Sequence, residues 1–224
     1  MWQTFSSINR SIAMKNLFFL IAIVLILSSC GNNKKEIPAS TVDTSSKVEV
    51  PKDEDGLSQQ DSIKATGRQI LVFLKENNYP ELVKYFSSEG VLFSPYGFID
   101  TAKSKKLTPD DFLESINKKW ILTWGSYDGT GEAIQLSVPN YLKKFVYNAD
   151  YLNAEAVGFD QTMKQGNSLN NLKTIYPNHH FIDYHFSGFD QKNNGMDWTS
   201  LRLVFEKTDG QYFLIAIIHD QWTI

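Results

Sequence analysis

Residues 59–224 are the part of the chain predicted to fold. In the first half of this part, apolar residues recur at helical spacing, which indicates amphipathic helices. The first predicted helix begins with the capping sequence of residues 58–61 (SQQD). Ser58 can accept a hydrogen bond from a free backbone amide there, and Asp61 places an acid in the first turn. The apolar pattern ends at Asn77. Further helices are predicted to begin at Pro80 and Thr108, and a shorter one to cover 140–147.

The second half is richer in strand-like runs separated by turn residues. Strands are expected at 120–127, 132–136, 179–187, 198–206 and 212–222. The sequence Asp-Gly-Thr-Gly separates the first two runs, and Asn-Gly and Asp-Gly occur in the links between the last three. These pairs favour tight hairpin turns. The carboxy-terminal part is therefore predicted to be a three-stranded antiparallel meander.

Helices followed by a meander predict an α+β domain over 59–224, in which amino-terminal helices pack on a curved, mainly antiparallel sheet. This order of elements resembles the nuclear-transport-factor-2-like and cystatin-like families. The resemblance implies a cone-shaped fold whose helices and sheet can enclose a pocket. Those families include enzymes, binding modules and scaffolds, so the resemblance implies no particular function.

An uninterrupted apolar run, LFFLIAIVLIL, occupies residues 17–27 and follows Lys15. As a helix it would be about 17 Å long, which is too short for the roughly 30 Å hydrocarbon core of a bilayer. The run therefore predicts a signal peptide over 1–29 and not a permanent membrane span. Met14 resembles a usual start, so 1–13 are expected to lie upstream of the true start.

The apolar run is followed by Leu27-Ser28-Ser29-Cys30, and here the chain resembles a bacterial lipoprotein precursor. The resemblance implies cleavage before Cys30 and attachment of diacylglycerol to its sulfur, so that acyl chains hold the protein in a membrane. It also implies lipoprotein processing and sorting machinery as partners and an extracytoplasmic location in the cell envelope. Gly31, in place of an aspartate, favours the outer membrane in a cell that has one.

The segment after the cysteine is polar, contains no aromatic residue and includes two prolines. Such a segment buries too little apolar surface to offset the entropy of ordering it. Residues 30–58 are therefore predicted to be a lipidated cysteine followed by a disordered tether. A flexible chain of this length has an end-to-end distance of roughly 30 Å.

Composition narrows the function classes. The chain has 224 residues, 42% of them hydrophobic and 21% charged, which excludes a disordered chain and a multi-span membrane protein. The net charge of −3 and the scattered basic residues argue against nucleic acid as a partner. A single cysteine excludes an intramolecular disulfide. No cofactor motif is found, and the glycine-rich residues 124–131 lack the Lys-Ser/Thr of a phosphate loop. No nucleophile motif is found either, because the sequence contains no Gly-x-Ser-x-Gly and its only cysteine is the predicted lipid attachment site.

The histidines are candidate metal ligands, and all four lie near the carboxy terminus. On a strand, His179, Asp183 and His185 would share one face, and His219 on a neighbouring strand could add a nitrogen. However, His179 and His185 would be nearly 20 Å apart along an extended strand. The spacing leaves three alternatives open: a metal site, a polar sheet face or a pocket for an organic ligand.

Asp183 and His185 are also candidates for a general acid and base. Alternate positions on a strand are about 7 Å apart, so both side chains could touch one ligand in a cavity. The competing interpretation is that Asp183 is a solvated or hydrogen-bonded acid. His219 and Asp220 are neighbours in sequence and should point to opposite faces of a strand, so they cannot form a dyad.

Aromatic residues are crowded between residues 120 and 151, and Trp124 and Tyr127 are the candidates for ligand binding among them. Aromatic rings stack on pyranose sugars, and an envelope location would supply glycans. The competing interpretation is ordinary core packing.

Three functions follow as hypotheses. The first is a non-enzymatic, lipid-anchored envelope protein that binds a small molecule, a glycan or a partner protein. The second is an envelope hydrolase or lyase that uses Asp183 with His185, with or without a metal. The third is a structural component of an envelope assembly.

Overall fold

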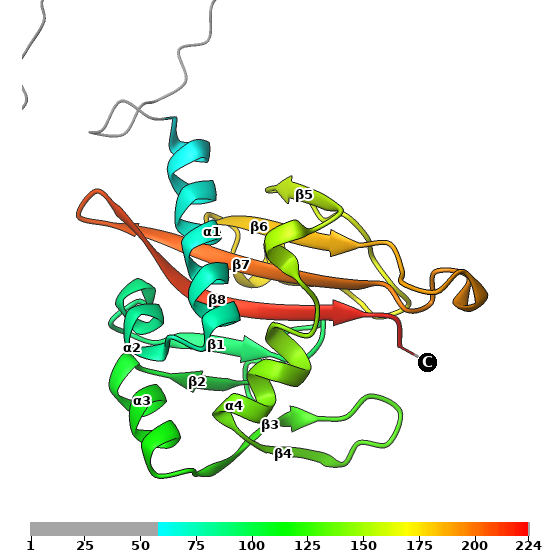
Figure 1. Ribbon diagram of the computed structural model, residues 1–224, viewed down its shortest axis with the longest axis horizontal. Helices are drawn as coiled ribbons and strands as arrows, with labels where there is room; N and C mark the ends of the chain where they lie inside the picture. The colour runs from blue at the N-terminus through cyan, green and yellow to red at the C-terminus, as the bar shows by residue number, and fades with distance from the viewer. Residues whose placement is uncertain (1–57, 224) are drawn as a thin grey trace, which may run out of the picture. The chain divides into compact units, whose positions relative to one another are not determined.

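The centre of the domain is a six-stranded sheet with the strand order β2-β1-β8-β7-β6-β5 (Figure 1). Its strands are β1 (Val91–Ser94), β2 (Lys105–Leu107), β5 (Ala156–Phe159), β6 (His180–Phe186), β7 (Thr199–Thr208) and β8 (Gln211–Gln221). The computed structural model describes residues 58–223. The predicted signal peptide, Cys30 and the predicted tether up to residue 57 lie outside the described residues.

The carboxy-terminal meander is confirmed, because β6, β7 and β8 pair in antiparallel fashion along their lengths. Strand β5 pairs antiparallel with β6, and β2 pairs antiparallel with β1. One pairing is parallel, between β1 and the carboxy-terminal half of β8, where Ser94 lies opposite Ile218. The sheet is thus mainly antiparallel, and the fold is α+β as predicted.

The structure adds three strands that the sequence pattern did not indicate. These are β1, β2 and β5, of three or four residues each. All four residues of β1 are buried, so the strand lacks the alternation that marks a half-buried strand. The predicted hairpin of β3 (Ile121–Ser126) and β4 (Ala133–Ser137) is present, but it forms a separate two-stranded sheet.

The longest helix, α1 (Gln59–Glu76), begins and ends where predicted. The Ser58 side chain accepts a hydrogen bond from the Asp61 amide at 3.2 Å, which caps the first turn. The helix ends at Asn77, which adopts the left-handed conformation with φ 55°. A buried stripe that includes Ile63, Ile70 and Leu74 faces the sheet.

The remaining helices are short. Helices α2 and α3 begin within one residue of the predicted starts at Pro80 and Thr108, and α4 with one turn of π-helix covers the predicted segment 140–147 up to Val146. The bounds of these elements are α2 (Tyr79–Leu82), η1 (Val83–Tyr85), α3 (Pro109–Asn117), α4 (Val138–Tyr141), η2 (Leu142–Val146), η3 (Tyr151–Asn153), α5 (Leu172–Ile175) and η4 (Gln191–Asn193).

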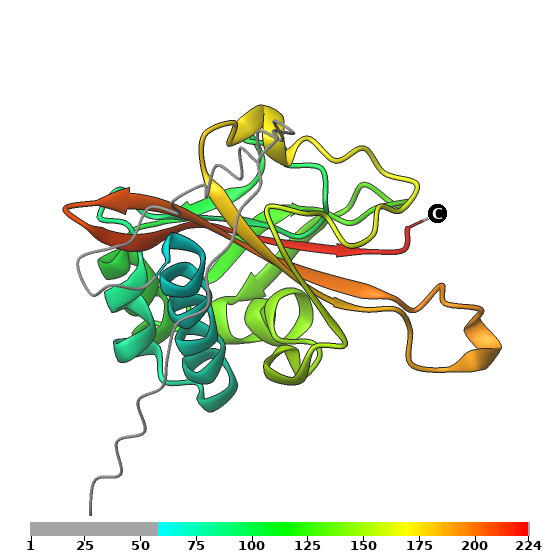
Figure 2. The same cartoon turned by 90° about the horizontal axis from the view of Figure 1, so that it is seen from above.

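Different structures cover the two faces of the large sheet. Helices α1, α2 and α4 lie on one side, and the segment 160–178, yellow in Figure 2, crosses the other side. The helical side holds the larger hydrophobic cluster, to which β7 contributes Leu203 and Phe205. The opposite side holds a smaller cluster around Leu172 and Val204. Within 58–223, no helix combines the length and hydrophobicity needed to cross a bilayer.

Candidate functional site

A groove of about 560 Å³ lies between the loop that follows β1 and the turn of the β3–β4 hairpin. The loop begins at Pro95, which is buried, and then carries Tyr96 and the exposed Phe98. The lining combines aromatic rings with hydroxyl side chains, contributed by Tyr96, Phe98, Ser104, Ser126, Tyr127 and Thr130. This volume lies within the range of roughly 300–1,000 Å³ that is typical of ligand pockets.

The two walls of the groove are hydrogen-bonded to each other. The hydroxyl of Tyr96, on the loop, accepts a hydrogen bond from the backbone amide of Asp128, on the hairpin turn, at 3.2 Å. Burial raises the pKa of Tyr96, so this hydroxyl is protonated at neutral pH. On the hairpin wall, Lys144 Nζ donates to the Tyr127 hydroxyl at 3.0 Å and lies 4.5 Å from the centre of its ring. Both tyrosine rings are therefore held in place.

The turn that forms the hairpin wall depends on glycine. Gly129 and Gly131 have φ values of 79° and 72°, in the left-handed region that favours glycine. The amide of Gly131 donates to the carbonyl of Tyr127 at 2.9 Å, and the Tyr127 amide donates to the carbonyl of Glu132 at 2.7 Å. These bonds close the predicted hairpin turn and place Tyr127 at its base.

The charged side chains that line the groove are Asp100, Lys103 and Asp128. Lys103 Nζ lies 3.8 Å from a carboxylate oxygen of Asp100, and both side chains are solvent-exposed. Such a pair contributes little to stability. The lining thus carries two carboxylates and one ammonium, a slight excess of negative charge.

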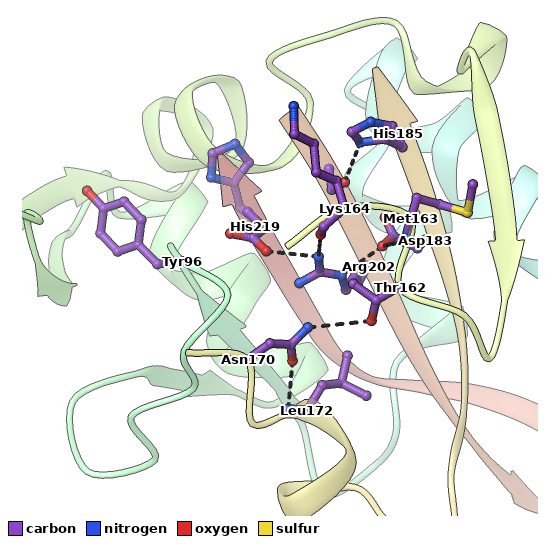
Figure 3. Close-up of polar contacts among 12 residues, drawn as sticks. Tyr96, Thr162, Met163, Lys164, Asn170, Leu172, Asp183, His185, Arg202 and His219 are labelled. Carbon is purple, nitrogen blue, oxygen red and sulfur yellow. Dashed lines mark hydrogen bonds and ion pairs between the residues drawn. The ribbon is translucent and has the colours of Figure 1, made fainter. Parts of the chain in front are cut away.

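A buried ionic network lies on the sheet face that the segment 160–178 covers (Figure 3). Arg202 Nε donates to Asp183 Oδ2 at 2.9 Å, and one terminal nitrogen of Arg202 donates to Asp220 Oδ2 at 2.8 Å. The covering segment adds two bonds to the network, because the Met163 amide donates to Asp183 and the Lys164 carbonyl accepts from Arg202, each at 3.0 Å. All three charged side chains are buried.

The end of β8 holds the groove loop from both faces of the sheet. On the helical face, His219 Nδ1 lies 3.0 Å from the carbonyl oxygen of Pro95. A carbonyl can only accept, so Nδ1 carries the proton and Nε2 accepts from Thr199 Oγ1 at 3.1 Å. On the other face, Gly97 lies directly against the Asp220 carboxylate. A Cβ atom at position 97 would be 2.6 Å from Asp220 Oδ2.

Burial shifts the pKa values of two side chains at the end of β8. It lowers the pKa of His219 to about 4, and the imidazole is therefore neutral at neutral pH. Burial also raises the pKa of Asp220, against the opposing effect of Arg202. The prediction that His219 and Asp220 point to opposite faces of the strand is confirmed. His219 bonds to the Pro95 carbonyl on the helical face, and Asp220 bonds to Arg202 on the other face.

The candidate acid and base, Asp183 and His185, do not reach a common cavity. Asp183 is fully buried and accepts from Arg202 and from the Met163 amide. His185 shares a 2.9 Å hydrogen bond with Ser200, and burial lowers the pKa of the imidazole. Neither residue lines the groove. The sequence pattern indicated a polar face here but not that the segment 160–178 covers it.

The candidate metal ligands have separate environments. His179 precedes β6 and packs against the ring of Tyr176, whereas His219 lies on the opposite sheet face from Asp183 and His185. Among residues 58–223, no group of three or more His, Cys, Asp or Glu side chains is arranged to hold a metal ion. The fourth histidine, His180, bonds to Asp160 and to Gln59 at the start of α1, at 2.7 Å each.

The two candidate aromatic residues have different roles. Trp124 is a core residue, which corrects its selection as a ligand-binding candidate. Its ring is fully buried and stacked on Tyr141 with centroids 3.9 Å apart, and its Nε1 donates to the Leu136 carbonyl. Tyr127 does line the groove.

Sequence analysis missed two groove residues, Tyr96 and Phe98. They lie in the sequence SPYGF, residues 94–98, directly after the apolar run of β1. A proline and a glycine that separate aromatic residues indicate a turn that carries rings, and this signal could have pointed to the loop.

Comparisons of the chain with protein-family models, with curated proteins and with solved structures found no match.

Proposed function

We propose that this protein is a lipid-anchored binding module of the bacterial cell envelope, with the groove between residues 95–104 and the β3–β4 turn as its ligand site. The observation that carries the binding proposal is the half-exposed ring of Phe98, which lines the same groove as Tyr127, in a groove whose walls are joined by the Tyr96–Asp128 hydrogen bond. A concave, largely preformed site with aromatic walls and a few polar groups is typical of small-molecule binding.

The proposal that the protein is lipid-anchored rests on the sequence Leu27-Ser28-Ser29-Cys30. Acyl chains on Cys30 would hold the protein on the extracytoplasmic side of a membrane, and the lipoprotein processing and sorting machinery would act on the precursor. Two or three acyl chains give durable attachment, whereas one chain binds only reversibly.

The geometry does not favour the hydrolase or lyase alternative. Asp183 already accepts hydrogen bonds from Arg202 and Met163, and its side chain has no exposed surface. A general base must come within hydrogen-bond reach of the substrate proton that it removes. No contact in the described residues favours a structural component of an assembly over a binding module.

The anchor is tested by intact-mass measurement of the full chain purified from bacterial membranes. The expected mature protein begins at Cys30 and carries the mass of a diacylglyceryl group, with or without a further acyl chain. The C30A variant should keep the residues before position 30, counted from whichever of Met1 and Met14 is the start. A wild-type product with these residues intact, or with an unmodified Cys30, would refute the anchor.

The ligand site is tested by ligand-observed NMR of a small-molecule fragment library against the full chain in detergent. Fragments that bind the wild type should show no binding signal with F98A and an unchanged binding signal with F189A. Phe189 is a suitable control because it is 62% exposed and lies on the β6–β7 connection, outside the groove lining. Fragments that bind both variants equally well would show that the groove is not the site.

A further inference from the structure

We infer that the groove takes a neutral saccharide, with pyranose units packed against the rings of Phe98 and Tyr127. The inference rests on the proposed ligand site and names its chemical class. It does not depend on the lipid anchor, because all residues that carry it lie within 95–220, in the folded domain.

The aromatic side chains supply the first part of the argument. Phe98 keeps 47% of its surface exposed although it lies on a loop that the fold holds from both sides. Tyr127 forms the opposite wall and is fixed by Lys144 at its hydroxyl. The faces of a pyranose ring carry C–H groups, which pack against the negative face of an aromatic ring. Two aromatic rings that line one groove from different segments therefore suit a flat ligand with apolar faces.

The polar lining supplies the second part. A saccharide also needs partners for hydroxyl groups around its edge, and each hydroxyl can both donate and accept. The groove offers the hydroxyls of Ser104, Ser126 and Thr130 and the carboxylates of Asp100 and Asp128. This combination of rings and many small polar groups suits a ligand with alternating apolar faces and polar edges better than a purely apolar ligand.

Charge separates a neutral saccharide from an anionic ligand. The lining carries Asp100, Asp128 and Lys103, which lies beside Asp100, and the ammonium of Lys144 borders the groove at Tyr127. A phosphate or carboxylate ligand would meet two carboxylates of like charge, and both cations already have partners, Lys103 at Asp100 and Lys144 at Tyr127. A cationic peptide is the competing occupant that the slight negative excess would tolerate.

The rigidity of the loop also favours binding. The Pro95 carbonyl is bound by His219, the Gly97 backbone rests on Asp220, and the side chain of Asn171 bonds to both the amide and the carbonyl of Ile99. Phe98 is thus held between fixed neighbours. Less conformational entropy is lost when a ligand binds a wall that is already ordered.

The experiment is calorimetric titration of the detergent-purified full chain with four neutral tetrasaccharides: chitotetraose, cellotetraose, maltotetraose and mannotetraose. At least one should bind with a Kd of 1 mM or below. F98A and Y127A should each weaken this binding about tenfold, the loss expected for one ring contact. F189A should change it less than twofold.

Two further variants separate stacking from folding. Y127F keeps the ring and removes the hydroxyl that Lys144 binds, so it should bind far better than Y127A. Thermal unfolding of each variant should show one transition, which confirms that the folded domain is being titrated. Loss of binding in Y127F equal to that in Y127A would contradict packing on the ring.

Three outcomes would overturn the inference. The first is that none of the four sugars binds, and the second is that F98A binds a sugar as well as the wild type does. The third is that a tetralysine peptide binds in the groove in place of a sugar. If fragments still bind through Phe98 while sugars do not, the saccharide inference fails and the proposed binding function survives. An unmodified Cys30 would refute the anchor alone.

Discussion

His219 donates its Nδ1 hydrogen to the carbonyl oxygen of Pro95, 124 residues earlier in the chain. The bond joins the last strand of the sheet to the loop that forms one wall of the groove. It depends on the parallel pairing of β1 with β8, which brings Ser94 opposite Ile218. The neutral state of the imidazole follows from its burial.

Replacement of His219 by alanine should lower the free energy of unfolding by about 3 kcal/mol, because the Pro95 carbonyl and the Thr199 hydroxyl would lose a buried partner. Urea unfolding followed by circular dichroism measures the change. H179A is the control and should cost less than about 1 kcal/mol, since His179 is only partly buried. Equal losses in the two variants would show that the hydrogen bonds of His219 stabilise the fold no more than the contacts of His179 do.

The stability of the wild type should fall as the pH is lowered from 6.5 towards 4. The folded pKa of His219 is about 4, below its usual value of 6.5, so in this window the unfolded state binds more protons than the folded state. The resulting loss in the free energy of unfolding reaches about 3 kcal/mol near pH 4. The difference between wild type and H219A in urea unfolding, measured at pH 7 and pH 4.5, isolates this effect. A difference that does not change with pH would contradict it.

Arg202 should be sensitive to replacement because it lies between two buried carboxylates. R202M should lower the free energy of unfolding by about 3–5 kcal/mol, since Asp183 and Asp220 would be left buried without their cation. The triple variant D183N/R202M/D220N should recover much of this loss, because it removes all three charges together. A triple variant less stable than R202M would show that the charges act independently.

The contact between Gly97 and Asp220 can be tested by a double-mutant cycle. G97A places a methyl group 2.6 Å from Asp220 Oδ2, and it should cost about 1–3 kcal/mol through overpacking. In a chain that already carries D220A the same change should cost at least 1 kcal/mol less, because the carboxylate is gone. Additive costs would show that the two residues do not interact.

Trp124 and Trp120 provide a matched comparison of a core ring with a surface ring. W124A should cost about 3–5 kcal/mol, because it removes a fully buried ring that stacks on Tyr141. W120A should cost less than about 1 kcal/mol, since Trp120 is 42% exposed. Similar costs for both variants would place Trp124 outside the core.

These two tryptophans also show why the candidate site was only partly predictable. Both lie in the same aromatic-rich stretch, and nothing in their immediate sequence separates a core ring from an exposed one. Trp124 is buried because Tyr141 of α4 packs on it, whereas Tyr127 reaches the groove because it lies at the base of the hairpin turn. Burial of an aromatic ring depends on what packs over it, and that information is distributed along the chain.

Asp183 illustrates a different limit. Strand periodicity placed it on the face opposite Ile182 and Tyr184, and those two side chains do lie in the core on the helical side. Periodicity alone could not show that the segment 160–178 covers the Asp183 face. Nor could it identify Arg202 as the partner of the carboxylate, since the two residues meet only because their strands pair in this register.

Local sequence was enough to predict the start and end of α1, the helix capped by Thr108, the turns of the β3–β4 and β7–β8 hairpins, and the carboxy-terminal meander, whereas the Asn-Gly pair between β6 and β7 lies in a longer connection that contains η4. Each depends on backbone conformations and hydrogen bonds among residues a few positions apart. Three other relations became visible only in the folded domain: β1 runs parallel to β8, Arg202 joins Asp183 to Asp220, and Phe98 and Tyr127 line one groove. These relations join residues from 18 to more than 100 positions apart, so they are set by strand order, register and packing across the whole domain.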